Sequence, residues 1–188
     1  MAGFGLRLCQ TMGMTDGYAG GLKEMLIDPA DTNPIFTGDP VALTAGYVEE
    51  ATGAASNNDF SIYGVFMGCR YVDADGSYVF KNRWDGGAGR TEIKAHVAIP
   101  MNGTFLIKGT TGQVYTQADI GVRKGVVYAA GSTQSGDSRI SLGAAGATVA
   151  TGPLMVQGLA ELPGNSFAID EPVFLCTVVR QSAFFTAA

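Results

Sequence analysis

Short segments in which apolar and polar residues alternate, separated by turn residues, constrain the fold of this chain most. The clearest runs from Glu92 to Ile99, places Ile93, Ala95 and Val97 on one side, and stops at Pro100. A period of two predicts a strand with one buried face. Strands joined by short turns cannot be parallel, because a parallel crossover needs a dozen or more residues. The sequence therefore predicts an all-β fold, an antiparallel β-barrel or sandwich.

Two hairpins are expected from turn residues between such segments. Ile62 to Val72 and Ser77 to Trp84 flank Asp73-Ala74-Asp75-Gly76, and residues 92–99 and 104–108 flank Asn102-Gly103. Asn-Gly and Asp-x-x-Gly sequences favour tight turns between strands. Further strands are expected at residues 122–130, 139–142, 154–159 and 173–180. The best helical candidate, Gly20 to Asp28, is short, and residues 116–121 have the length of one helical turn.

Composition divides the chain into three parts. Glycine contributes 27 of the 188 residues, and charged residues only 15%. We expect residues 1–21 to form an extended glycine-rich N-terminal arm and residues 22–181 a single β-barrel-like domain. Residues 182–188 form a short apolar C-terminal tail. A tail that stays free in water is expected to be more polar than this one. The low charge of the whole chain likewise suggests that a partner covers part of the surface.

Several classes of function are disfavoured by the sequence. The net charge is −5 and basic residues are scattered, which argues against nucleic acid as a partner. No apolar run reaches the length needed to span a bilayer, so no membrane partner is expected. Cys9, Cys69 and Cys176 form no C-x-x-C pair and are predicted to be reduced thiols. The single histidine, His96, is best interpreted as a strand residue. We predict no catalytic residue, cofactor or metal site, and the protein is not expected to be an enzyme.

Two constellations leave alternatives open. Asp73 and Asp75 beside Gly76 are reminiscent of a calcium loop, but the twelfth position is Trp84 instead of glutamate, so a hairpin turn is the better interpretation. Trp84 with Tyr71, Tyr78 and Phe80 could line a sugar site, although aromatic residues at strand spacing are more often core.

Three stretches together carry a resemblance to a known family. They are Ile35 to Val41; Gly64 to Gly76 with Tyr78 to Phe80 and Trp84; and Ser138 to Leu142 with Val156 to Leu159, Pro163 to Asn165 and a last strand ending at Val179-Arg180. In this order and spacing the chain resembles small capsid decoration (cement) proteins of tailed bacteriophages. The resemblance runs from about Tyr18 to Arg180.

The resemblance implies a β-barrel-like protein that binds the outer face of a phage capsid and clamps neighbouring capsomers. Its partners would be the major capsid protein and further copies of itself, as a homotrimer or alternatively a homodimer. It would be made in the cytoplasm of the bacterial host and reside on the virion exterior. We predict that Phe4, Leu6 and Arg7 of the arm and Phe184 and Phe185 of the tail make the contacts. The alternative for these residues is packing on their own domain.

Two other classes of function remain open at this point. The first is a receptor- or carbohydrate-binding β-domain of a head fibre or tail, which predicts an exposed aromatic platform around Trp84. The second is a small hydrolase that uses Asp or Glu, for which the spacing of the acidic residues gives no specific signal.

Overall fold

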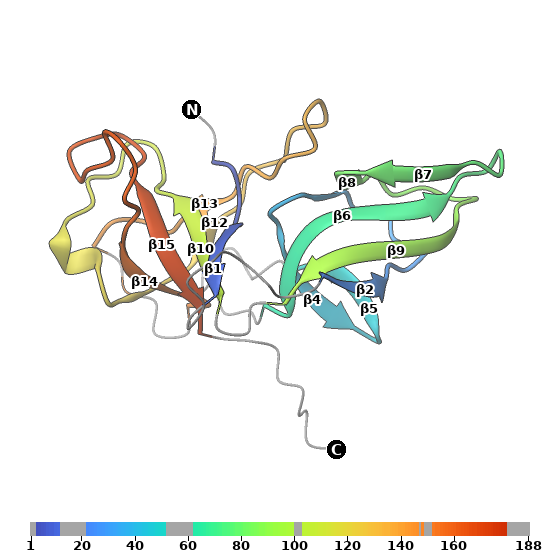
Figure 1. The fold of residues 1–188 in the computed structure, drawn as a ribbon, viewed down its shortest axis with the longest axis horizontal. Coiled ribbons are helices and arrows are strands. Elements are labelled where there is room, and N and C mark those ends of the chain that lie inside the picture. The colour runs from blue at the N-terminus through green and yellow to red at the C-terminus, as the bar shows by residue number, and fades with distance from the viewer. Residues whose placement is uncertain are drawn as a thin grey trace, which may run out of the picture.

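The computed structural model describes residues 3–11, 22–51, 62–99, 103–146, 148 and 152–179. The strands gather into two lobes that lie side by side along the long axis (Figure 1). Every pair of named strands is antiparallel, apart from isolated single bridges. The predicted all-β antiparallel class is therefore confirmed, and within the described residues the sheets remain open without closing into a barrel.

The first lobe, called the β6 lobe, comprises β2 to β9. Their bounds are β2 Leu22–Leu26, β3 Ile35–Phe36, β4 Pro40–Thr44, β5 Tyr47–Glu50, β6 Gly64–Val72, β7 Tyr78–Lys81, β8 Arg83–Trp84 and β9 Thr91–Ala98. The main sheet has the order β2-β9-β6-β4-β5, with β7 also paired to β6, and β3 pairs with β8. The sheet curls until Ile27, just after β2, forms a single bridge with Val48 of β5.

Strand β6 organises this lobe because it bends. At Gly68 the backbone has φ +123°, and a Cβ atom there would lie 2.9 Å from the carbonyl oxygen of Lys81. Only glycine adopts this conformation at low cost. The first part of β6 pairs with β4 and the second part with β7, while β9 pairs along its other edge with two register shifts. The predicted β6–β7 hairpin is confirmed, with a turn closed by the 2.9 Å hydrogen bond from Asp73 N–H to the Ser77 carbonyl.

The second lobe, called the β15 lobe, comprises β1 and β10 to β15. Their bounds are β1 Arg7–Thr11, β10 Gly103–Lys108, β11 Arg123–Lys124, β12 Val126–Val127, β13 Ser141–Leu142, β14 Leu154–Leu159 and β15 Val173–Val178. The sheet order is β1-β10-β15-β14-β11, and β12 pairs with β13. One 3₁₀ turn, η1, spans Gln117–Asp119. It lies within residues 116–121, where the sequence has room for one helical turn.

The protein has two hydrophobic cores, one within the β6 lobe and one centred in the β15 lobe that also includes Val65 of β6 and Ala98 of β9. The β6 lobe packs Phe66, Tyr71 and Trp84 with smaller side chains from β4 and β9. The β15 lobe packs Phe105 and Phe174 together with residues from β12 to β14. In β9 the expected inward residues Ile93, Ala95 and Val97 are buried, so the predicted alternation is confirmed.

One expectation about pairing is wrong. Strands β9 and β10 do not form a hairpin: β9 pairs with β2 and β6, and β10 pairs with β1 and β15. The chain leaves one sheet and enters the other between these strands. The helical candidate Gly20 to Asp28 contains strand β2, because β9 offers Leu22–Leu26 a complete ladder of backbone partners.

The expected N-terminal arm also needs correction. Strand β1 is the edge of the sheet in the β15 lobe, and Leu6 is only 1% exposed within the core of that lobe. Residues 12–21, and with them the boundary expected at residue 21, lie outside the described residues, but residues 6–11 belong to the domain. The cause is a short alternation in which Leu6 and Leu8 flank the exposed Arg7 and face the core. The expected C-terminal tail, residues 182–188, lies outside the described residues.

Residues 5 and 6 also join the two lobes. Gly5 N–H donates to the Ile140 carbonyl (3.2 Å), and Leu6 N–H donates to the Gly38 carbonyl (2.8 Å). Ser138 N–H in turn donates to the carbonyl of Thr37 (2.9 Å). Gly5 has φ +72°, and a Cβ atom there would lie 2.5 Å from the Ser138 Cβ. The close approach of three segments thus requires glycine at this position.

Candidate functional site

The outer face of the β6 lobe exposes four large apolar side chains, which we call the outer apolar face. Leu22 and Leu26 of β2 are each 51% exposed, and Tyr78 and Phe80 of β7 are 66% and 72% exposed. Leu26 pairs with Lys94, Lys94 with Arg70, and Arg70 with Phe80, so the row crosses four strands. Residues directly opposite each other on antiparallel strands point to the same side of the sheet. The apolar side chains therefore share one face.

A compensated group of charges lies between these apolar edges. Arg70 donates two hydrogen bonds of 3.0 Å to the carboxylate of Glu24, and Lys94 donates a third of 3.4 Å. The hydrogen bond from Arg70 is the main reason that the pKa of Glu24 lies below its ordinary value. The ring of Phe80 stacks on His96 at 6.3 Å between centroids. His96 is thus a strand residue, as predicted.

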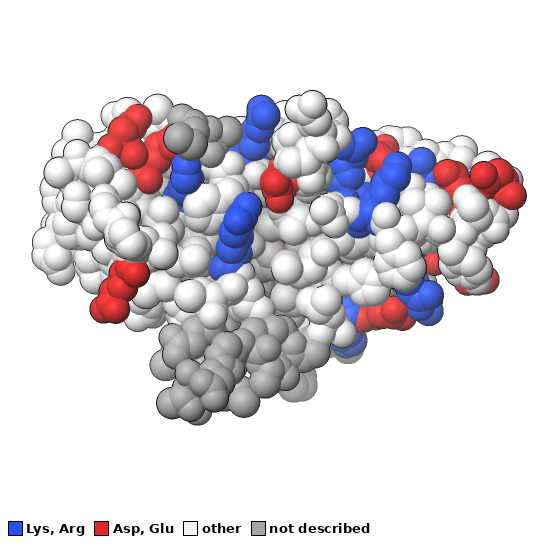
Figure 2. Space-filling model, turned by 45° about the horizontal axis from the view of Figure 1, so that its top comes forward, with Lys and Arg blue, Asp and Glu red and all other residues white. Residues whose placement is uncertain are grey.

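Charge is sparse over much of the molecule. Figure 2 shows one side, most of which is uncharged; basic side chains lie mainly over its middle, and acidic side chains lie towards both ends as well as near the middle.

The predicted N-terminal contact residues meet at one cavity between the lobes. Phe4, Leu6 and Arg7 line a cavity of about 320 Å³ together with Met67 and Asp137. The Arg7 guanidinium lies 4.8 Å from the Phe4 ring centroid, and its side chain is 57% exposed. Leu6 is packed on its own domain and offers no surface to a partner. Phe184 and Phe185 lie outside the described residues.

The aromatic platform expected by the carbohydrate-binding alternative is not formed by Trp84. Trp84 is fully buried, and Tyr71 is 1% exposed. The Arg90 guanidinium covers both rings, at 4.6 Å from the centroid of Tyr71 and 5.3 Å from that of Trp84. The core interpretation of these two residues is correct, and of the four aromatic residues only Tyr78 and Phe80 are exposed.

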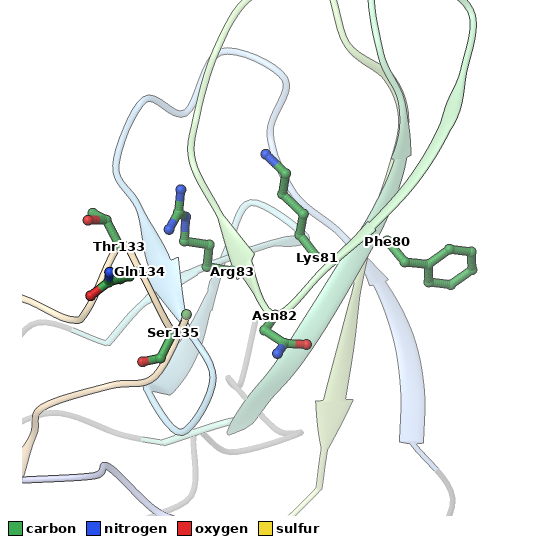
Figure 3. Close-up of a pocket in the computed structure, with 8 residues that line it drawn as sticks. Phe80, Lys81, Asn82, Arg83, Thr133, Gln134 and Ser135 are labelled. Atoms are coloured by element: carbon green, nitrogen blue, oxygen red, sulfur yellow. The ribbon is translucent and has the colours of Figure 1, made fainter.

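A polar groove lies between the β7–β8 segment and the loop 131–137. It has a volume of about 420 Å³, and its lining includes Lys81, Asn82, Arg83, Thr133, Gln134 and Ser135. We call the space that these residues line the polar groove. In Figure 3 Lys81 and Arg83 extend to the side of the loop, whereas Phe80 points away from it. The sequence gives no local signal for this groove, because its two walls are about 50 residues apart.

A buried ion pair in the β15 lobe also has no counterpart among the predicted sites. Lys124 Nζ donates to Asp119 Oδ1 (2.6 Å), and the two side chains are 1% and 3% exposed. Burial alone would raise the pKa of Asp119, but hydrogen bonds from Lys124 and from the backbone of Thr116 and Gly146 hold it below its ordinary value. The capping pattern Thr116-x-x-Asp119 is the one signal in the sequence that could have marked this aspartate.

A carboxyl with a raised pKa lies at the joint of the lobes. Glu50, at the end of β5, lines a cavity of about 410 Å³ with Phe36 of its own lobe and Tyr128 of the other. Burial, followed by the charges of Asp39 and Asp31, raises the pKa of Glu50 to about 7. The hydroxyl of Tyr128 donates to the carbonyl of Ala51, so this region links the two lobes.

Within the described residues no three His, Cys, Asp or Glu side chains gather in a way that could hold a metal ion. Asp73 to Gly76 form a hairpin turn, as expected. Cys69 and Cys176 are buried free thiols, and burial raises the pKa of Cys69 to about 12, so this thiol is unreactive near neutral pH. In the ranges that the structure describes, no helix is long and apolar enough to cross a membrane.

Comparisons with models of protein families, with curated proteins and with solved structures found no match to this chain.

Proposed function

We propose that this protein is a structural component of a tailed-bacteriophage virion that binds the outside of the capsid and clamps neighbouring capsomers. The observation that carries the proposal is the outer apolar face, where Leu22, Leu26, Tyr78 and Phe80 are at least half exposed. Exposed apolar groups gathered on one sheet face favour a protein partner. The sequence resemblance supplies the identity of that partner, the major capsid protein.

The composition of the outer apolar face suits a contact with protein. Aromatic and leucine side chains flank a charge group that is already paired internally through Glu24, Arg70 and Lys94. Burying these paired charges costs less than burying isolated ones, because each keeps its hydrogen bonds. Tyrosine and phenylalanine bury large areas with few rotatable bonds, and they are enriched in the centres of interfaces.

We further propose that the protein acts as a homotrimer, with a homodimer as the alternative, on the exterior of the virion. Linking several weak contacts raises the effective concentration of each, so a multimer clamps a shell more strongly than one copy. Phe4 and Arg7 at the lobe joint, and Phe184 and Phe185, are the proposed contacts between subunits. Leu6 is excluded from this set, since its side chain is 1% exposed.

Co-sedimentation with undecorated phage heads tests the proposal. We expect the protein to bind saturably, at a fixed number of copies per shell. Tyr78→Ser combined with Phe80→Ser should lower the affinity at least tenfold. Val114→Ser is the matched control, because Val114 is 79% exposed but belongs to the β15 lobe, and it should leave the affinity within twofold.

Two outcomes would count against parts of this proposal. Unchanged binding of the double variant would show that the outer apolar face is not the contact. Absence of any binding by the unmodified protein, together with a monomeric mass in solution, would overturn the capsid role and favour a receptor-binding domain.

A further inference from the structure

The polar groove is built on a rigid frame. Gly136 N–H donates to the Ser132 carbonyl, and Ser132 N–H donates to the Asp137 carbonyl, each at 2.8 Å. Thr37 N–H then joins the two walls by donating to the carbonyls of Asn82 (3.1 Å) and Gly136 (2.9 Å). A ligand that enters the groove meets walls that are already ordered, which lowers the entropic cost of binding.

The close contact of the walls depends on glycine. Gly136 has φ +78°, and a Cβ atom there would lie 2.9 Å from the Cβ of Asn82. An ordinary residue at this position would be strained and would push the loop away from Asn82. The narrow base of the groove is therefore a consequence of this residue.

The groove is rich in hydrogen-bond donors. Lys81 and Arg83 are two residues apart on an extended segment and extend to the same side (Figure 3). Lys81 Nζ bonds Asp85 at 2.9 Å, and Arg83 uses its Nε on the same carboxylate. Within the described chain the terminal guanidinium nitrogens of Arg83 have no hydrogen-bond partner, and neither do the amides of Asn82 and Gln134.

These features define the ligand that would fit. The two cations and Asp85 leave one net positive charge, which suits a single carboxylate, whereas Asp85 would repel a phosphate dianion. Among the described residues that line the groove Phe80 is the one aromatic residue, and its ring points away from the loop (Figure 3), so a nucleobase would meet no ring on the loop side. The side-chain amide of Gln134 and the hydroxyls of Thr133 and Ser135 can both donate to and accept from the hydroxyls of a sugar. The volume of about 420 Å³ lies within the range of small-ligand sites.

We propose that the polar groove binds a sugar acid, the carboxylated unit of an acidic polysaccharide. The carboxylate pairs with Arg83 and Lys81, and the sugar hydroxyls bond Thr133 and Gln134. This goes beyond the proposed capsid role, because it assigns a small-molecule ligand to a groove between the β7–β8 segment and the 131–137 loop. Phe80 borders both the groove and the outer apolar face, so the variants that test the groove are confined to Arg83 and Gln134, which lie outside that face.

Calorimetric titration with tetragalacturonate, an acidic oligosaccharide, tests the inference, and neutral maltotetraose serves as the matched ligand. We expect saturable binding of tetragalacturonate and at least tenfold weaker binding of maltotetraose. Arg83→Gln should weaken binding at least tenfold by removing the charge that pairs with the carboxylate. Gln134→Ala, on the exposed loop, should weaken it about threefold. The control is Arg139→Gln, an exposed arginine of the β15 lobe, which should change nothing.

The inference is overturned if maltotetraose binds as tightly as tetragalacturonate, or if no saturable binding occurs up to about 10 mM. The inference is also overturned if the Gln134→Ala and Arg83→Gln variants bind tetragalacturonate as tightly as the unmodified protein does. Thermal unfolding of each variant shows whether the fold persists, and Gln134→Ala keeps the test decisive if Arg83→Gln fails to fold. Co-sedimentation with phage heads, measured on the same variants, should be unaffected, so failure of one proposal is distinguishable from failure of the other.

Discussion

The two lobes use charge and aromatic residues in opposite ways. The β15 lobe buries an ion pair, Lys124 with Asp119, inside its packing. The β6 lobe keeps the ion pairs of Glu24 in contact with solvent and exposes two aromatic rings, Tyr78 and Phe80. The comparison indicates that the β15 lobe carries charge for its own architecture, whereas the β6 lobe carries surface features directed outwards.

The reason for the buried pair lies in what it joins. Asp119 accepts from the backbone N–H groups of Thr116 and Gly146 (2.8 Å each), and Lys124 donates to the Ala144 carbonyl (2.9 Å). The pair therefore fixes η1, β11 and the 143–146 loop at one point. A buried pair is weak evidence for net stability, because desolvation offsets much of the attraction. Removing one of the two partners, in contrast, leaves the other charge buried and unpaired.

The largest effect is expected from Asp119→Asn. Lys124 would remain buried without its counter-charge, which should lower the free energy of unfolding by about 3–5 kcal/mol. Chemical denaturation monitored by tryptophan fluorescence and circular dichroism measures this. The double variant Asp119→Leu with Lys124→Met is the control, and it should recover most of the loss. A decrease below about 1 kcal/mol for Asp119→Asn would mean that solvent reaches the pair, as it does in the β6 lobe.

Leu6→Ala tests whether the β15 lobe depends on its N-terminal segment. Leu6 is 1% exposed in the core of this lobe, so truncation should cost about 2–5 kcal/mol. Arg7→Ala is the matched control on the next residue, with a side chain that is 57% exposed, and it should change the stability by less than about 0.5 kcal/mol. Equal effects of the two variants would restore the idea of a detached arm.

Local patterns in the sequence predict local structure well here. The alternation at residues 92–99 and the Asp-x-x-Gly turn before Ser77 are set by neighbouring residues, and both are confirmed. Strand β2 shows the limit. Leu22, Met25 and Leu26 have the spacing of a helix face, yet the partner strand β9, some 70 residues away, decides for a strand.

Pairing and exposure are decided by contacts between distant residues. The turn sequence after Pro100 is the same whether the chain returns to its own sheet or crosses to another, so the false β9–β10 hairpin could not be recognised. The sequence could not predict that Tyr78 and Phe80 are exposed either, because an aromatic residue in an alternating strand usually belongs to the core. The polar groove joins residues 81–83 with residues 133–135, and no local pattern relates them.

The joint between the lobes should make stability depend on pH through Glu50. Its pKa is raised to about 7 in the folded protein, above the ordinary value of 4.5. The folded state therefore holds a proton that the unfolded state releases, and stability falls as pH rises from about 5 to 7. The loss amounts to at most about 3 kcal/mol. Glu50→Gln should remove most of this dependence, measured as denaturation midpoints between pH 5 and 7.

Glu49→Gln is the control for that measurement, since Glu49 directly precedes Glu50 in β5 and is exposed. The buried Asp39 also has a pKa raised mainly by burial and acts in the same direction. A small residual slope in the Glu50→Gln variant is therefore expected. An unchanged slope would mean that Glu50 is well solvated and that the lobes are not coupled through it.

The smallest effect is expected for the exposed ion pairs of the β6 lobe, and it completes the comparison with Asp119. Glu24→Gln removes the partner of Arg70 and Lys94, but all three side chains remain in water, where a lost ion pair costs about 0.2–1 kcal/mol. The loss should shrink further in high salt, which screens exposed charges far more than buried ones. Denaturation of both variants at low and high ionic strength measures the contrast. If Glu24→Gln costs as much as Asp119→Asn, the outer face is held together by its charges and is part of the architecture, not a surface kept free for a partner.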